Sequence, residues 1–151
     1  MKKFLFSAAL IAIFTGCSDN AGTSERINGF THELKNQEDS LMQEVMDGHD
    51  AAMAKMGKLA AYRKVAVKKI DSLVKAKSAD LQETGSYKTL ADGLKSAEDK
   101  MNEWMGSFSM DSAKNDKQRR IAYLRSEKSK VTKVKEEILE IIRRADSLFR
   151  K

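Results

Sequence analysis

The side chains best suited to chemistry in this sequence are methionine thioethers and one histidine. Apart from Met1, the methionines fall into two short windows, one around His49 and one around Trp104: Met42, Met46, Met53 and Met56, then Met101, Met105 and Met110. On a helix with about 100° per residue, the first group and His49 share an arc of roughly 80° on the apolar side. Thioethers and imidazole suit a soft cation, and copper(I) is the natural candidate outside the cytoplasm.

Three interpretations of the two windows stay open. Methionine can fill irregular layers of a helical core, with sulfur–aromatic contacts to Trp104 and Phe108 and with His49 hydrogen-bonded inside; we favour this one. Alternatively, a copper(I) site forms, capped by the aromatic ring of Trp104, and its ligands are His49, Met53, Met56, Met101 and Met105. In the third, His49 and a methionine hold haem, although no Cys-x-x-Cys-His attachment motif is present.

Other chemistry has less support in the sequence. Zinc or iron is disfavoured because carboxylates are absent from the predicted apolar stripes. There is no nucleophile elbow, phosphate loop or pair of inward-facing carboxylates. Asp50 is expected to point about 100° away from His49 on a helix. We therefore expect that the chain is not an enzyme.

Helical periodicity must position both windows. Apolar residues recur at spacings of three and four over 27–73, 87–108 and 121–148, and the chain contains no proline. This pattern predicts an all-α fold, an elongated antiparallel three-helix bundle with coiled-coil-like packing over residues 25–151. We expect Gly85-Ser86 to separate the first two helices, with Ser86 as N-cap, and a bend near Gly48 or Gly57.

The connection between the first two helices decides whether the windows meet. If the first helix ends near Lys75 and the second begins near Ser86, Met105 lies near Met53 and Trp104 near Met56. A tighter turn centred on Gly85 would place Met105 beside Lys64 instead.

The N-terminus has the features of an export signal. Lys2 and Lys3 precede an apolar stretch, 4–14, that is too short to span a bilayer. It ends in Phe14-Thr15-Gly16-Cys17, which resembles the bacterial lipobox, with Phe14 where leucine is more usual. The resemblance implies cleavage before Cys17 and acyl chains such as palmitate on that residue. We expect a signal peptide (1–16), a lipidated cysteine with a flexible tether (17–24) and a helical domain (25–151); the alternative is a plain secretory signal.

The predicted cellular location and the charge distribution limit the classes of partner to be expected. Ser18 favours the outer membrane under the enteric sorting rule, and Asp19 weakly resembles a surface-export signal, so we expect a location in the cell envelope. Residues 18–57 carry three basic and eight acidic groups, and 111–151 carry thirteen and seven, which predicts complementary first and last helices. Partners are then the membrane, an envelope protein or a second copy. Contact of the basic last helix with anionic head groups stays open, and nucleic acid is not expected.

Two motifs resemble those of a family of small Bacteroidota lipoproteins often labelled "viral A-type inclusion protein". They are His49-Asp50-x-x-Met53-x-x-Met56-Gly57 and Met101-x-x-Trp104-Met105-x-x-Phe108. The family pattern has a proline where this chain has Lys55. The resemblance implies a lipoprotein over essentially the whole mature chain, and no activity comes with it.

Overall fold

The computed structural model describes residues 36–76 and 81–150. The predicted signal peptide, Cys17, the tether and the first predicted helical positions, Ile27 to Leu34, lie outside these residues. Contacts assign all of the described residues to the second of two units of the chain, Leu34–Lys151. Every residue of the core described below belongs to the second unit.

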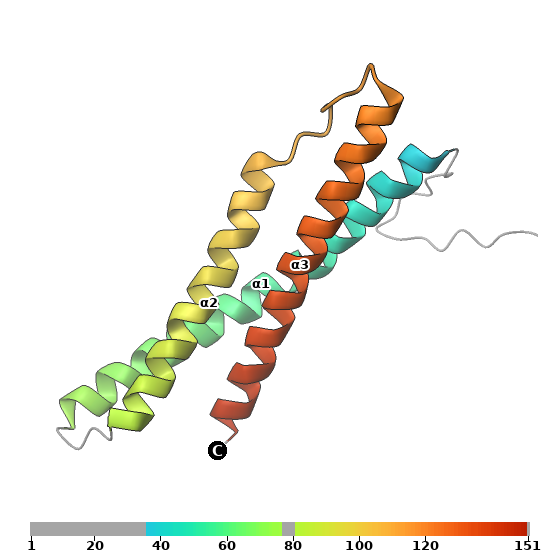
Figure 1. Ribbon diagram of the computed structural model, residues 1–151. Helices are drawn as coiled ribbons and strands as arrows, with labels where there is room; N and C mark the ends of the chain where they lie inside the picture. Colours follow the sequence, from blue (N-terminus) through green and yellow to red (C-terminus); the bar gives the residue numbers. More distant parts are fainter. Residues whose placement is uncertain (1–35, 77–80, 151) are drawn as a thin grey trace, which may run out of the picture. The chain divides into compact units, whose positions relative to one another are not determined.

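Three helices make up the described part of the second unit: α1 (Gln37–Lys75), α2 (Leu81–Ser107) and α3 (Lys117–Phe149). Each helix packs against both others, and successive helices run in opposite directions (Figure 1). The predicted all-α, antiparallel three-helix bundle is therefore confirmed. None of these three helices carries an apolar stretch long enough to cross a membrane.

The core follows the seven-residue repeat expected of coiled-coil packing. Positions seven residues apart on each helix are buried, which keeps one seam of every helix facing its neighbours. The repeats are Val45, Ala52, Leu59 and Ala66 on α1, Tyr87, Leu94 and Met101 on α2, and Leu124, Val131, Ile138 and Ala145 on α3. The apolar stripes predicted from the sequence are these seams.

Side-chain caps fix where α1 and α3 begin. The Asn36 carboxamide oxygen accepts from the backbone N–H groups of Glu38 (2.8 Å) and Asp39 (3.1 Å). The Asp116 carboxylate accepts from the backbone N–H of Arg119 at 3.0 Å. Each cap satisfies N–H groups that have no partner within the first turn of a helix.

The predicted helix break at Gly85-Ser86 is wrong. α2 begins at Leu81, and the Ser86 hydroxyl donates to the carbonyl of Gln82 at 2.9 Å inside the helix instead of capping its start. A glycine costs about 1 kcal/mol in a helix interior. Burial of Tyr87 and Leu90 in the next turn outweighs this cost, since each large buried side chain contributes about 1.5–3 kcal/mol.

Neither Gly48 nor Gly57 interrupts α1, which runs unbroken through both. Gly48 is buried, and a Cβ atom there would lie 3.0 Å from a methyl group of Val131 on α3. Gly48 therefore serves a close approach of two helices. Gly57 has open space around it, with nothing within 4 Å of a Cβ atom.

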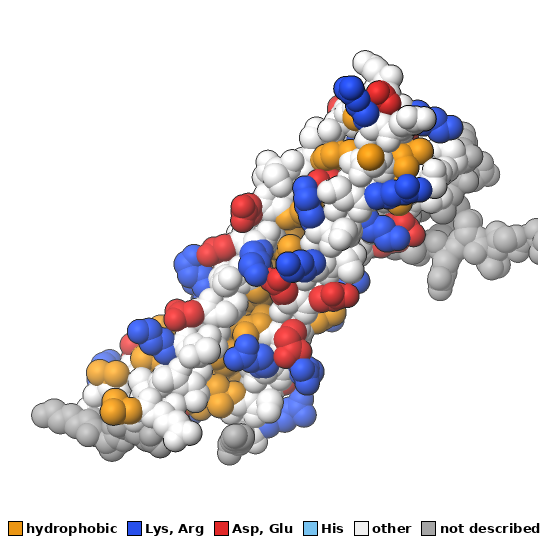
Figure 2. All heavy atoms as spheres, viewed as in Figure 1, with side chains coloured by type: hydrophobic (Ala, Val, Ile, Leu, Met, Phe, Trp, Pro, Cys, Tyr) orange, Lys and Arg blue, Asp and Glu red, His pale blue; other side chains and the backbone are white. Residues whose placement is uncertain are grey.

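The expected charge complementarity between the first and last helices is confirmed at their paired ends. Arg120 of α3 bonds Glu38 of α1 at 3.0 Å, and Lys128 of α3 pairs with Glu44 of α1 at 2.8 Å. Along α2 and α3, acidic and basic side chains are intermixed on the visible face, with apolar side chains between the two helices (Figure 2).

Candidate functional site

The two methionine windows face each other across α1 and α2. The ring centroids of His49 and Trp104 lie 5.7 Å apart, and Arg63 pairs with Glu98 at 3.4 Å further along the same interface. α1 ends at Lys75, as in the first of the two registers considered above, but α2 begins at Leu81, before Ser86. The predicted neighbours of Trp104 and Met105, which are Met56 and Met53, stay predictions. The tighter turn centred on Gly85, which would have placed Met105 beside Lys64, is wrong.

The predicted ligand residues divide between core and surface. Met101 is fully buried and Trp104 is buried, while Met56 and Met105 are partly buried and pack against the same core. Met53 is 37% exposed and belongs to the surface of α1. One of the four thioethers thus lies in the core, two pack against it and one is exposed.

His49 lies at the edge of the core with its side chain 21% exposed. Its ring is tilted by 37° against the indole of Trp104. Its Nδ1 lies 2.9 Å from a carboxylate oxygen of Asp50. The expectation that Asp50 points away from His49 is therefore wrong for the ends of the two side chains, because rotation about their side-chain bonds brings them together. This contact leaves Nε2 as the nitrogen for any metal.

A buried carboxylate, which the sequence analysis did not find, lies behind Trp104. Glu127 of α3 is 3% exposed, and it accepts from the indole N–H of Trp104 at 3.0 Å and from the Lys130 ammonium at 2.7 Å. The hydrogen bond and the charge of Glu127 raise the pKa of Lys130 above its usual value. Paired in this way, a carboxylate can occupy an apolar core.

The signal for Glu127 was present in the heptad pattern. Arg120, Glu127, Val134, Ile141 and Leu148 form a seven-residue series on α3. Arg120 is buried as well, and it donates to Glu38 at 3.0 Å and to the carbonyl of Ser112 at 2.9 Å. The expectation that no carboxylate lies on the apolar stripes is therefore wrong at Glu127.

Four aromatic rings continue from His49 to the loop between α2 and α3. Trp104 stacks on Phe108 with centroids 5.0 Å apart, and Phe108 stacks on Tyr123 at 6.2 Å. The Tyr123 hydroxyl accepts from the backbone N–H of Ser109 at 2.7 Å. The rings connect the three helices at one end of the bundle and tie down the start of the loop.

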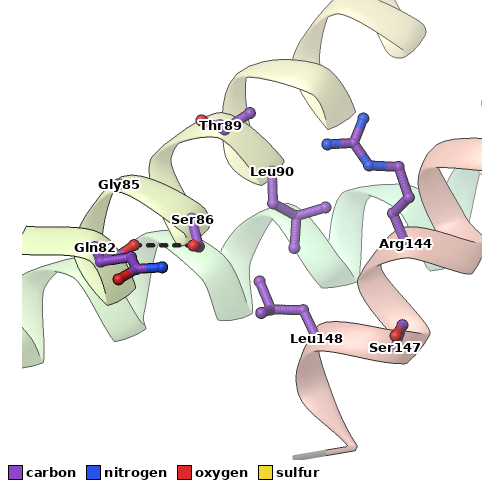
Figure 3. A pocket seen from close by; sticks show the side chains of 8 residues that line it. All are labelled: Gln82, Gly85, Ser86, Thr89, Leu90, Arg144, Ser147 and Leu148. Carbon is purple, nitrogen blue, oxygen red and sulfur yellow. Dashed lines mark hydrogen bonds between the residues drawn. The ribbon is translucent and has the colours of Figure 1, made fainter.

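A separate groove of about 500 Å³ lies between the start of α2 and the end of α3 (Figure 3). Leu90 and Leu148 point toward each other across it, and the Arg144 guanidinium lies beside Leu90. Hydroxyl and amide groups complete the lining: Gln82, Ser86, Thr89 and Ser147. The groove offers one cation and several hydroxyl groups but no carboxylate, so it lacks a paired acid and base.

Classical metal-binding side chains do not cluster in the part of the chain that the structure describes. No three histidine, cysteine, aspartate or glutamate side chains lie close enough there to hold one ion together. A site at His49 would therefore depend on thioethers, as the sequence analysis proposed.

No protein-family model, curated protein or solved structure matches the chain. The resemblance to small Bacteroidota lipoproteins remains a prediction that rests on the two motifs.

Proposed function

We propose that this chain is a lipid-anchored helical lipoprotein of the bacterial cell envelope with an interaction or scaffold role. The observation that carries the proposal is the single cysteine of the chain, Cys17, directly after Thr15-Gly16 at the end of an apolar export signal. A thiol at that position is the acceptor for a diacylglycerol group. Two or more acyl chains on one residue hold a protein at a membrane far more firmly than one.

The helices supply the surface for an interaction role. α1 has 39 residues, and at about 1.5 Å per residue it extends for roughly 58 Å. The three helices fill their core with one another and expose charged residues along their lengths. Such a surface suits contacts with an envelope protein or with a second copy of the chain.

Labelling with palmitate tests the anchor. The full chain is expressed in a bacterium supplied with an alkyne-bearing palmitate, and label and location are followed in membrane and soluble fractions. We expect labelled protein in the membrane fraction, and loss of label in the Cys17→Ser variant. Ser18→Ala is the matched control and should keep the label. Unlabelled wild-type protein in the soluble fraction would contradict the proposal.

A second candidate function is copper(I) binding by a histidine and thioethers. The observation that favours it is the position of His49 against Trp104, with Met56, Met101 and Met105 in the adjoining core. The exposed thioether of Met53 would have to turn inward to join these groups. Copper(I) needs no deprotonation of thioether ligands, so the apolar surroundings do not hinder binding.

Competition for copper(I) against a chromophoric chelator tests this candidate on the chain from residue 18 onward. Tight one-to-one binding should be lost in His49→Leu and in Met105→Leu, with helicity retained. Met110→Leu is the control, because Met110 is largely exposed and outside the proposed ligand set. Binding that survives both ligand substitutions would place the metal elsewhere, and weak binding by all variants would leave the methionines as core residues.

A further inference from the structure

The C-terminal half of α1 carries cations that the bundle does not neutralise. Residues 58–75 contain six basic side chains and one acidic side chain. Lys58 pairs with Asp146 and Arg63 with Glu98. The ion pairs formed among residues 36–76 and 81–150 do not involve Lys69, which lies on another side of α1. They do not involve Lys64, Lys68 or Lys75 either.

These three lysines share one exposed face of α1 with two valines. At about 100° per residue, the face occupies an arc of roughly 120°. Its members, which we call the lysine–valine face, are Lys64, Val67, Lys68, Asp71, Val74 and Lys75, all of them exposed. Val67 is 45% and Val74 is 61% exposed. A shallow hollow of about 310 Å³ lies at its edge, lined by Arg63 and by Lys64, Val67 and Lys68 of the face.

The face points away from α3. Lys58 and Tyr62, which contact Asp146 of α3, lie on the other side of α1. Arg63, at the edge of the lysine–valine face, contacts α2 through Glu98. The face is thus the outer surface of α1, beyond its contact with α2.

Several cations of α3 are in a different situation. Lys128, Lys130 and Arg143 each pair with a carboxylate, from Glu44, Glu127 and Glu140 respectively. The last helix, for which the sequence left contact with anionic head groups open, therefore has part of its positive charge neutralised by ion pairs within the protein. On α1, Val67 and Val74 lie exposed among unpaired lysines, whereas Leu139 is the one large apolar side chain that the described part of α3 exposes.

We propose that the lysine–valine face docks on the surface of an anionic lipid bilayer; the inference rests on the proposed lipid anchor for bringing the chain to a membrane. Lysines interleaved with apolar side chains suit this partner, because the ammonium groups reach anionic head groups while the valines enter the boundary of the acyl region. Charge complementarity and apolar burial act together on one face. A lipid on Cys17 would raise the effective concentration of this face at the bilayer.

Vesicle co-sedimentation tests the docking without the anchor. The chain from residue 18 onward keeps the whole Leu34–Lys151 unit and its core; circular dichroism first verifies its helicity. We expect binding to vesicles of phosphatidylcholine with about 30% phosphatidylglycerol, which gives the surface a strong negative potential. We expect no binding to vesicles of phosphatidylcholine alone. Replacing Lys64, Lys68 and Lys75 with glutamine should weaken binding about fivefold per lysine.

The matched control removes the same charge from α3. Lys117, Arg125 and Lys133 are exposed, and their replacement with glutamine should change binding by less than about threefold. Equal weakening by both triple variants would overturn the proposal, because binding would then follow net charge alone. No binding to the anionic vesicles would overturn it as well.

The full chain in bacterial membranes provides a second measurement. A membrane-impermeant amine reagent should modify Lys64 and Lys68 more slowly than Lys117 and Lys133, as followed by mass spectrometry. Equal rates would contradict docking even if Cys17 carries palmitate. Conversely, vesicle binding without palmitate on Cys17 would support docking and contradict the anchor, so the two proposals fail separately.

Discussion

The indole N–H of Trp104 donates to the carboxylate of Glu127 across 3.0 Å and joins α2 to α3 inside the core. The two residues are 6% and 3% exposed, so water does not compete effectively for either group. The carboxylate also accepts from Lys130, whose ammonium reaches solvent. Glu127 thus connects a buried aromatic residue to the surface through one charged group.

Removing the Glu127 carboxylate should destabilise the bundle, and the loss should be larger when no acceptor oxygen remains. Glu127→Ala leaves the Trp104 N–H buried without a partner, and we expect a loss of about 2–3 kcal/mol in the free energy of unfolding. Glu127→Gln keeps an acceptor oxygen and loses the charge, for which we expect about 1 kcal/mol. Urea unfolding followed by circular dichroism measures both.

Glu136→Ala is the control for this pair of substitutions. Glu136 is exposed on the same helix, and its removal should change stability by less than about 0.5 kcal/mol. A loss for Glu127→Ala no larger than that of the control would show that the Trp104–Glu127 bond contributes nothing net.

The heptad pattern predicted the fold well because it depends on local spacing alone. The seam through Leu124, Val131 and Ile138 is visible in the sequence and buried in the structure. Glu127 lies in the neighbouring seven-residue series, so its place on the buried side was visible too. Its hydrogen-bond partner, the indole of Trp104, is 23 residues earlier in the chain, and no local pattern reveals that contact. The start of α2 was misplaced for a similar reason, since packing of Tyr87 and Leu90 overrides the preference of Gly85.

The candidate site could be predicted only in part. The expected helix lengths predicted that the two methionine windows lie opposite each other. The contact of His49 with Trp104 agrees with this prediction. Side-chain details did not follow, because helix geometry fixes the direction of Cα–Cβ bonds and not the rotamers beyond them. The Asp50 contact with His49 is of that kind. The exposure of Met53 follows instead from its position about 100° around α1 from Ala52 in the buried seam.

Alanine at the two glycines of α1 should have opposite effects on stability. Gly57→Ala meets open space and gains helix propensity, so we expect it to stabilise the bundle by about 0.5–1 kcal/mol. Gly48→Ala gains the same propensity but brings a methyl group 3.0 Å from Val131, a fully buried and stiff side chain. Overpacking of this kind costs about 1–3 kcal/mol, which leaves a net loss. Thermal unfolding of the two variants gives the comparison, and a stabilised Gly48→Ala would show that α1 and α3 separate easily.

Arg120 should resist replacement by lysine. Its Nε donates to Glu38 and its Nη1 to the carbonyl of Ser112, two directions that one ammonium cannot reproduce from the same place. We expect Arg120→Lys to cost about 1–2 kcal/mol and to speed hydrogen exchange in the loop around Ser112. Arg119→Lys is the neighbouring control, since that side chain is 83% exposed, and its effect should stay within about 0.5 kcal/mol. Similar losses of unfolding free energy for both variants would mean that the buried contacts of Arg120 contribute nothing to stability.

Stability should decline in acid through Asp146 at the α1–α3 contact. The Tyr62 hydroxyl and then the Lys58 ammonium donate to this carboxylate and lower its pKa below the usual 3.8. A lowered pKa in the folded state stabilises the fold above the unfolded value of 3.8, and the contribution is lost as the pH falls through the folded pKa. The difference in Tm between the wild type and Asp146→Asn should therefore be constant from neutral pH down to 3.8 and narrow below it.

Tyr62→Phe should reduce this acid dependence, because it removes the largest cause of the pKa shift. Asp71→Asn, at an exposed position on α1, should leave the acid dependence unchanged. A difference that persists undiminished in strong acid would mean that Asp146 acts through packing instead of through its charge.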